Sequence, residues 1–209
     1  MPILKMRTCV KYAAAALMLL GGAAVPMTSD GANPILPLWE YIPDGEPYIF
    51  EDPDNPGRYR IYLYGSHDNL VTEYCGRDQV VWSAPVENPN EWRFDDVIFE
   101  SRRDANGRLL YANGQGDVLY APDVALVTAA DGTKTYYLYP NNQAGGRNGM
   151  VARSSRPDGP FEVCNWSTDN PRATVGDLRF DPAVLVEPIC AGQYSNQMSC
   201  AISAKASRS

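Results

Sequence analysis

Short runs of apolar and β-branched residues recur along the chain, and clusters of Gly, Asn, Asp or Pro separate them. Residues 59–64 form one such run, rich in Tyr, and follow the turn-forming cluster at 54–57. Residues 136–139 follow the Asp-Gly pair at 131–132 in the same way. Aromatic and β-branched residues between turn signals are typical of strands joined in hairpins. The pattern therefore predicts an all-β fold.

One unit of this pattern occurs three times, beginning at Asp44, Asp123 and Asp181. Each copy starts with an Asp close to a Pro and continues into a short β-branched run, which in the first two copies leads through a turn to a Tyr-rich strand. Further strand candidates lie at 79–83 and 149–154, so each complete repeat holds about four strands, the content of one propeller blade. We expect a β-propeller truncated to about two complete blades and the start of a third. A β-sandwich, which also uses short strands and turns, is the alternative.

The composition narrows the class of protein. Apolar residues make up 44% and charged residues 21%, with 17 Gly, 17 Pro and 13 Tyr, which fits a globular domain with many turns. The formal net charge is −7, and the basic residues form no cluster larger than a pair such as Arg102-Arg103. This argues against nucleic acid as a partner. The cysteine spacing matches no metal-binding motif, so we predict no metal site from these residues.

The N-terminus carries the pattern of a secretory signal peptide. Basic residues within 5–11 precede the apolar run 13–20 and the small residues 21–24. We predict a signal peptide over 1–24, cleaved after Ala24. A membrane anchor is the alternative, but the run is shorter than the roughly 20 apolar residues that a spanning helix needs. We therefore expect a secreted or periplasmic protein without membrane attachment after cleavage.

The C-terminal residues lose the hairpin pattern. From Glu187 onward no turn leads into a Tyr-rich strand, and the last residues are small and polar. We predict a partial β-propeller domain over 25–186 and an atypical, disordered tail over 187–209.

Three ordered motifs carry a resemblance to a known family. The segment 33–47 with the later 62–68, the segment 119–124 with 136–139, and the segment 180–186 resemble the first three blades of glycoside hydrolase family 43. Members of this family are five-bladed β-propellers of the arabinofuranosidase and xylosidase type. The resemblance implies that this chain corresponds to the N-terminal part of such a propeller.

The resemblance also implies a chemistry. The family hydrolyses glycosides with inversion, which requires one carboxylate to activate water and one carboxylic acid to protonate the leaving oxygen. By resemblance Asp44 is the general base and Asp123 is the third carboxylate, which tunes the pKa of the acid. The family's acid is a Glu in a later blade, beyond the motifs found here. The expected function is thus that of a glycosidase with doubtful activity, and the alternative is a truncated propeller that binds carbohydrate without cleaving it.

Three further residues are predicted to contact substrate. Trp39 lies beside the Asp44 motif, Glu46 shares the face of Asp44 on a strand, and Asp181 begins the third unit. Tyr41, Trp82 and Tyr120 are further candidates for contact with a sugar ring, but aromatic residues at strand ends usually pack inside, so we select only Trp39. The resemblance implies a plant-type oligosaccharide or polysaccharide, bearing α-L-arabinofuranosyl or β-xylosyl units, as the partner of a monomer.

Two further points concern metals and neighbouring families. His67 is the only histidine, and without a second metal-binding motif we expect it to be a surface or packed residue. Some members of the family bind a structural Ca²⁺, and the sequence leaves this open. Arg179-Phe180-Asp181 is faintly similar to a motif of the retaining fructan hydrolases, but the Asp-Gly-Glu-Pro segment that begins at Asp44 fits family 43 better.

Overall fold

The computed structural model describes residues 35–70, 72–174 and 180–186. The predicted signal peptide and the predicted tail lie outside the described residues and stay predictions. All described residues belong to one unit of the chain, Asn33–Ser209. Among them, no helix is long and apolar enough to cross a membrane.

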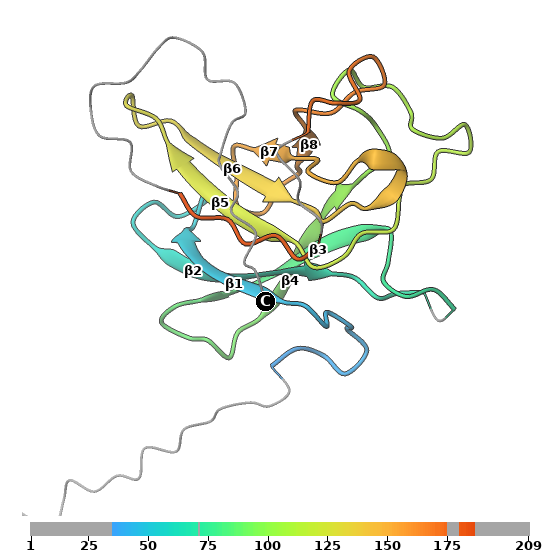
Figure 1. Cartoon of the computed structure of the whole chain (residues 1–209). Helices are drawn as coiled ribbons and strands as arrows, with labels where there is room; N and C mark the ends of the chain where they lie inside the picture. The colour runs from blue at the N-terminus through green and yellow to red at the C-terminus, as the bar shows by residue number, and fades with distance from the viewer. Residues whose placement is uncertain (1–34, 71, 175–179, 187–209) are drawn as a thin grey trace, which may run out of the picture. The chain divides into compact units, whose positions relative to one another are not determined.

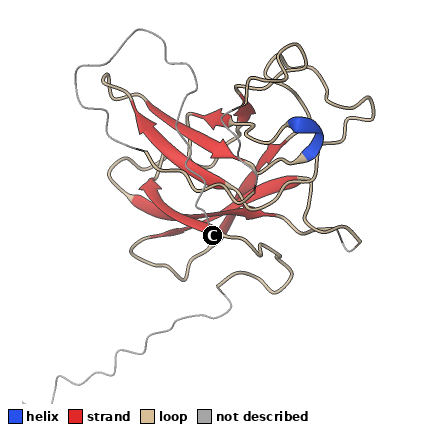
Figure 2. Ribbon diagram, viewed as in Figure 1, coloured by secondary structure: helices blue, strands red, loops and turns tan. Residues whose placement is uncertain are grey.

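The described residues form two four-stranded antiparallel sheets (Figures 1 and 2). The strands of the first sheet are β1 (Glu46–Glu51), β2 (Tyr59–Ser66), β3 (Asp78–Pro85) and β4 (Arg93–Glu100). Those of the second sheet are β5 (Asp123–Thr128), β6 (Lys134–Tyr139), β7 (Ala152–Ser154) and β8 (Glu162–Val163), with the short 3-10 helix η1 (Ala144–Gly146) between β6 and β7.

Strands that follow one another along the chain are neighbours within each sheet. This order is that of a propeller blade and differs from the Greek-key connections of immunoglobulin-type sandwiches. The all-β prediction is confirmed, and the two meanders correspond to the two predicted blades. Two strand predictions were inaccurate. The strand expected over 149–154 begins only at Ala152, after Gly149 with φ +80°, and the run that follows Asp181 is not a strand.

The hairpin turns form where the sequence places glycine. Gly57 in the β1–β2 turn has φ +82° and Gly132 in the β5–β6 turn has φ +86°. This left-handed region strains any residue with a Cβ atom. Backbone hydrogen bonds close both turns, from Asp52 to Arg58 at 2.8 Å and from Ala129 to Thr133 at 2.8 Å.

Both sheets contribute to one buried apolar cluster. The Tyr-rich strands supply much of it, because alternate residues of β2 such as Tyr62 and Tyr64 are completely buried. The rings of Phe50 in β1 and Tyr136 in β6 meet edge to face at 5.1 Å between centroids. Burying side chains of this kind contributes roughly 1.5–3 kcal/mol each, so the cluster holds the two sheets together.

The two sheets also meet at one end of their strands. Gln79, at the start of β3, donates through Nε2 to the carbonyl oxygens of Tyr120 and Pro140, both at 2.9 Å. These carbonyls lie just before β5 and just after β6. The backbone N–H of Leu119 donates to the carbonyl of Gly76 at 3.0 Å. We call this end, where β1, β3 and β5 begin and β2 and β6 stop, the leading end.

Gln79 provides a test of this junction. It is completely buried, and Gln79→Ala leaves two carbonyl groups without their donor. We expect the free energy of unfolding to fall by about 1–3 kcal/mol, measured by urea denaturation. The exposed Gln115 serves as control, because Gln115→Ala removes a similar amide that touches no second sheet. Equal effects of the two substitutions would contradict the role of Gln79.

Candidate functional site

Asp123 begins β5 and is the buried carboxylate of the leading end. It is 4% exposed and accepts three hydrogen bonds, from the Tyr48 hydroxyl in β1, from its neighbour Val124 N at 2.7 Å, and from Val184 N. Burial raises the pKa of Asp123, although the three hydrogen bonds act in the opposite direction. Parts of all three repeats therefore meet at one carboxylate.

Glu46 and Tyr48 lie on the same face of β1, because side chains two residues apart on a strand point the same way. Partial burial, and after it the negative charge of Asp123, raise the pKa of Glu46. The pKa of Tyr48 rises through burial and through its hydrogen bond to Asp123. The exposed Glu46 and the buried Asp123 thus interact electrostatically across the two sheets.

Asp44 lies exposed in the turn that leads into β1. The turn packs tightly on β2, because a Cβ atom at Gly45 would lie 2.8 Å from Leu63 Cδ1. Burial, and after it the negative charge of Asp44, raise the pKa of Asp68 in the loop after β2. The glycine at position 45 therefore lets the turn that carries Asp44 pack closely against β2.

Trp39 lies beside this turn and is 68% exposed. Its ring centroid is 6.0 Å from that of Trp82 in β3. With Tyr41, which is also exposed, it lines a cleft of about 770 Å³ formed by residues 39–43 and 67–69. The structure thus places Trp39 on the surface next to Asp44, where a ring can contact a ligand.

His67 connects two carboxylates beneath this cleft, an arrangement that the sequence did not indicate. Its Nδ1 lies 2.8 Å from Asp78 Oδ1, and its Nε2 lies 3.4 Å from Glu40 Oε1. Glu40 also accepts a hydrogen bond from Trp82 Nε1 at 2.7 Å. The hydrogen bond to Asp78 raises the pKa of His67 against the effect of burial. His67 is thus a packed residue that ties the chain before Asp44 to β3.

This arrangement bears on metal binding. Both ring nitrogens of His67 have carboxylate partners, so neither is presented as a free ligand. Within the described residues, no group of three or more His, Cys, Asp or Glu side chains is arranged to hold a metal ion. The question of a structural Ca²⁺, which the sequence leaves open, therefore stays open.

Asp181 lies exposed at the leading end, near the aromatic residues that precede β5. It has φ +48° and accepts a hydrogen bond from Asn141 Nδ2 at 3.3 Å. Its neighbour Phe180 contacts Tyr120, with ring centroids 5.2 Å apart. Segment 180–186 runs beside β5 (Figure 1), and Val184 packs on the small apolar cluster of the second sheet. Tyr120, one of the further aromatic candidates, is only partly buried.

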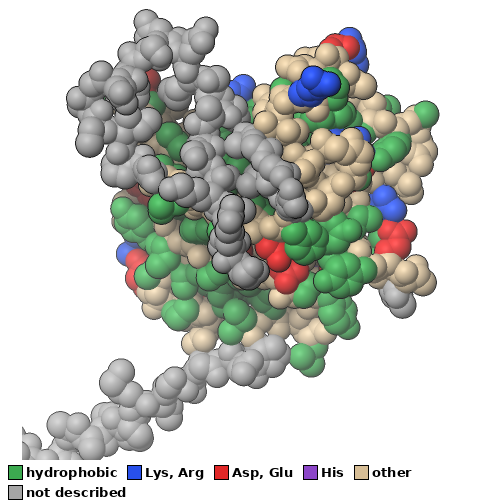
Figure 3. All heavy atoms as spheres, viewed as in Figure 1, with side chains coloured by type: hydrophobic (Ala, Val, Ile, Leu, Met, Phe, Trp, Pro, Cys, Tyr) green, Lys and Arg blue, Asp and Glu red, His purple; other side chains and the backbone are tan. Residues whose placement is uncertain are grey.

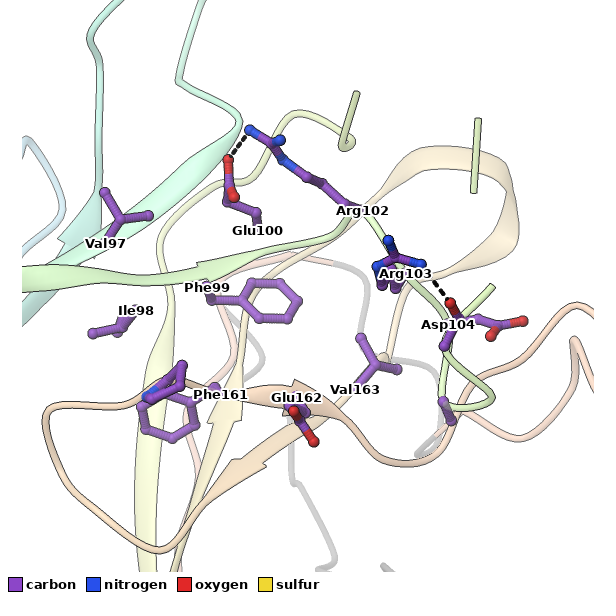
Figure 4. Close-up of a pocket in the computed structure, with 13 residues that line it drawn as sticks. Val97, Ile98, Phe99, Glu100, Arg102, Arg103, Asp104, Phe161, Glu162 and Val163 are labelled. Carbon is purple, nitrogen blue, oxygen red and sulfur yellow. Dashed lines mark hydrogen bonds and ion pairs between the residues drawn. The ribbon is translucent and has the colours of Figure 1, made fainter. Parts of the chain in front are cut away.

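Two further features are the surface composition of one face and a cavity between β4 and β8. Figure 3 shows acidic side chains beside a band of apolar side chains on the visible face. Figure 4 shows a cavity between β4 and β8, where Glu100 pairs with Arg102. The rings of Phe99 and Phe161 there are buried. Burial acts against ionisation of Asp104, but hydrogen bonds, those of Thr168 foremost, lower its pKa to about 2. The polar groups of this cavity are therefore engaged in structural contacts.

One comparison with known proteins, the match to a curated glycosidase, supports the family resemblance. No family model matches the chain. The chain is 38% identical over 170 residues to a curated xylosidase/arabinosidase of Thermoclostridium stercorarium, a match that covers 74% of this chain. A crystal structure of the GH43_1 enzyme from Xanthomonas citri complexed with xylose is similar with a TM-score of 0.48 and 22% identity, over 83% of this chain and 43% of that one. The predicted resemblance to xylosidases and arabinosidases is confirmed. The match spans only 30% of the curated relative's length.

The buried state of Asp123 gives a testable pH dependence. Its pKa is raised in the folded protein, so its contribution to stability is present at low pH and is lost as the pH rises through the folded pKa. Relative to the unchanged chain, Asp123→Asn should therefore become more stable as the pH rises from 3 to 7, measured by thermal melting. Asp131 is the control, because the Thr133 backbone N–H lowers its pKa and Asp131→Asn should show the opposite trend. Parallel trends for the two variants would contradict this account.

Proposed function

We propose that this chain carries part of the active site of a glycosidase that hydrolyses α-L-arabinofuranosides or β-xylosides of plant polysaccharide with inversion. The observation that carries the proposal is the placement of an exposed carboxylate, Asp44, and a buried one, Asp123, at the same end of two sheets that share a core. The name of the curated relative supports the substrate class. Because the match spans 30% of that relative, the activity is proposed for the protein as a whole.

Asp44 is proposed as the general base. Its exposure lets water reach its carboxylate, which accepts a proton from the water as the oxygen attacks the anomeric carbon. An inverting mechanism also needs an acid on the other side of the bond, with roughly 6.5–9.5 Å between the two carboxyl groups to leave room for the water.

Asp123 is proposed to act through its charge. Partial burial and, after it, the negative charge of Asp123 raise the pKa of Glu46, a neighbouring carboxyl group. The same effect on a carboxylic acid at the leaving oxygen keeps that acid protonated until it donates its proton. The hydrogen bonds from Tyr48 and Val184 hold Asp123 in place for this role.

The exposed residues around Asp44 are proposed to bind the sugar. The ring of Trp39 offers an apolar face to a sugar ring, and the carboxylates of Glu46 and Asp181 accept hydrogen bonds from sugar hydroxyls. We further propose that the protein is exported to the periplasm or the medium, on the basis of the N-terminal pattern over 1–24, and that it acts there as a monomer, as the family resemblance implies.

The general acid is proposed to lie outside the described residues, in the later blade where the family resemblance places it. A second candidate function follows, namely that this chain binds carbohydrate without cleaving it. The exposed aromatic rings and the cleft at Trp39 favour this candidate, because they lie wholly within the described residues.

The leaving group distinguishes the two candidate functions. A dinitrophenolate departs without a proton, so a dinitrophenyl arabinofuranoside or xyloside needs the base but no acid. We expect this chain to cleave such a glycoside, and to cleave xylobiose more slowly by about 10²- to 10⁴-fold than an enzyme with its acid. If the chain cleaves neither compound, the result favours a protein that binds carbohydrate without cleaving it. Rapid cleavage of xylobiose would show that the acid lies within the chain.

Substitution of the base tests the assignment of Asp44. Asp44→Asn should reduce release of dinitrophenolate by about 10²- to 10⁴-fold. Asp131→Asn, in the turn at the other end of β5, should leave the rate unchanged. Proton NMR of the first sugar released should show the inverted anomer. An unaffected rate in Asp44→Asn would remove Asp44 from the mechanism, and a retained anomer would contradict inversion.

A further inference from the structure

Another cleft opens at the leading end and is lined in part by Tyr120, whose ring also contacts Phe180 of the Asp181 segment. It measures about 530 Å³, within the range of roughly 300–1,000 Å³ typical of small-ligand sites. Its lining residues come from the loop before β5, from the loop after β6 and, with Arg77, from the residue just before β3. Those that offer rings or amides to the cleft are Tyr111, Asn113, Gln115, Tyr120 and Gln143.

The walls of this cleft are fixed before any ligand binds. The Tyr111 hydroxyl donates to Asp117 Oδ1 at 2.6 Å and accepts from Arg147 Nη2 at 2.8 Å. The guanidinium carbon of Arg147 also lies 5.7 Å from the centroid of the Tyr111 ring. Gln143 donates to Asn141 Oδ1 at 2.7 Å, and Asn113 donates to Gln115 at 3.1 Å. A site fixed in this way loses little conformational entropy on binding.

The charges around the cleft are already paired. Asp117 is buried and forms a bidentate ion pair with Arg147, with both nitrogen to oxygen distances at 2.6 Å. Arg77 pairs with Glu73 at 2.9 Å and donates to the carbonyl of Gly116 at 2.8 Å. The amides of Asn113, Gln115 and Gln143, each with only part of its hydrogen-bonding capacity used, and the aromatic rings remain to contact a ligand. The amides donate and accept hydrogen bonds without a net charge, which suits a neutral molecule rich in hydroxyl groups.

A row of aromatic rings connects this cleft with Asp44. The ring centroid of Tyr120 lies 6.2 Å from that of Tyr74 and 5.2 Å from that of Phe180. Tyr74 and Phe180 are exposed. The loop that carries Tyr74 contacts the segment before Asp44, because the Asp68 backbone N–H donates to the carbonyl oxygen of Tyr41 at 3.0 Å. Rings spaced in this way offer successive apolar faces to successive sugar units.

We propose that the cleft lined by Tyr111, Asn113 and Gln143 is a saccharide subsite, which binds one sugar unit of a neutral pentose oligosaccharide whose other units lie along Tyr120 and Tyr74 toward Asp44. The position of the reacting bond at Asp44 rests on the proposed function, whereas binding in the cleft does not require catalysis. The protein thus recognises a chain of several sugars, and a single sugar fills only part of the site.

Binding as a function of ligand length tests the proposal. The full chain is titrated calorimetrically with xylose and xylo-oligosaccharides of two to five units, and in parallel with arabinose and arabino-oligosaccharides. We expect the affinity to rise by about tenfold or more between the disaccharide and the tetrasaccharide in at least one series. Equal affinity for all lengths in both series, or no binding, would overturn the proposal.

Substitutions in the cleft test whether the increase in affinity with ligand length comes from this cleft. Asn113→Ala and Gln143→Ala change partly or fully exposed amides and should abolish most of the gain with length, while leaving the affinity for the disaccharide unchanged. Tyr111→Ala should also abolish most of this increase in affinity. If the loss of the Tyr111 hydroxyl contacts unfolds the chain, the two amide variants alone test the proposal. The control is Tyr59→Ala, an exposed tyrosine at the opposite end of the first sheet.

The outcomes separate this inference from the proposed function. Asp44→Asn should bind oligosaccharides with unchanged dependence on length, even though it should not cleave the activated glycoside. Length-dependent binding with no cleavage by any variant supports the subsite and counts against hydrolysis by this chain. Cleavage that depends on Asp44, with an affinity that Asn113→Ala and Gln143→Ala leave unchanged, supports the function and overturns the subsite.

Discussion

The hydrogen bond between Tyr48 and Asp123 is the contact on which the arrangement of the leading end depends. A carboxylate that is 4% exposed is costly unless donors surround it, and its three donors come from β1, from β5 and from segment 180–186. Each of these parts begins one copy of the repeated unit. The need to satisfy one buried carboxylate thus brings the starts of three sequence repeats to the same place.

Because the three repeats meet there, the candidate site residues, namely the carboxylates and the exposed aromatic rings, lie at one end of the sheets. The strands are antiparallel in each sheet, so the turn before β1 and the loops beside β5 and β6 lie together there. Asp44 lies in the turn before β1 and Glu46 begins β1, and partial burial, then the charge of Asp123, raise the pKa of Glu46. The aromatic rings of Trp39, Tyr74 and Tyr120 border the same end, which makes it suited to a ligand with both hydroxyl groups and apolar faces.

The sequence predicted local features well because they follow from local rules. Glycines at positive φ set the two hairpin turns, and the Tyr-rich strand β2 alternates between core and surface as its pattern indicates. Asp44 and Asp123 were selected through the family resemblance, and the structure places both at the leading end. Their roles stay proposals, because neither position nor burial alone defines a catalytic step.

The remaining contacts could not be predicted, since they join loops that are far apart in the sequence. The Arg147–Asp117 ion pair joins residues 30 positions apart, and Gln79 reaches carbonyls 41 and 61 positions away. No periodicity marks such residues. Asp181 was expected to begin a strand, but its positive φ and its contact with Asn141 place it in a bend beside β5.

The most direct test of the account is a map of where an oligosaccharide binds. Amide chemical shifts of the isotope-labelled chain, recorded during titration with xylotetraose and with its arabinose counterpart, report contacts residue by residue. The account predicts changes in residues 39–46, 72–78, 111–123 and 141–147, and none in the hairpin turns 52–58 and 129–133 at the opposite end. Changes confined to those turns, or no change with either sugar, would contradict it.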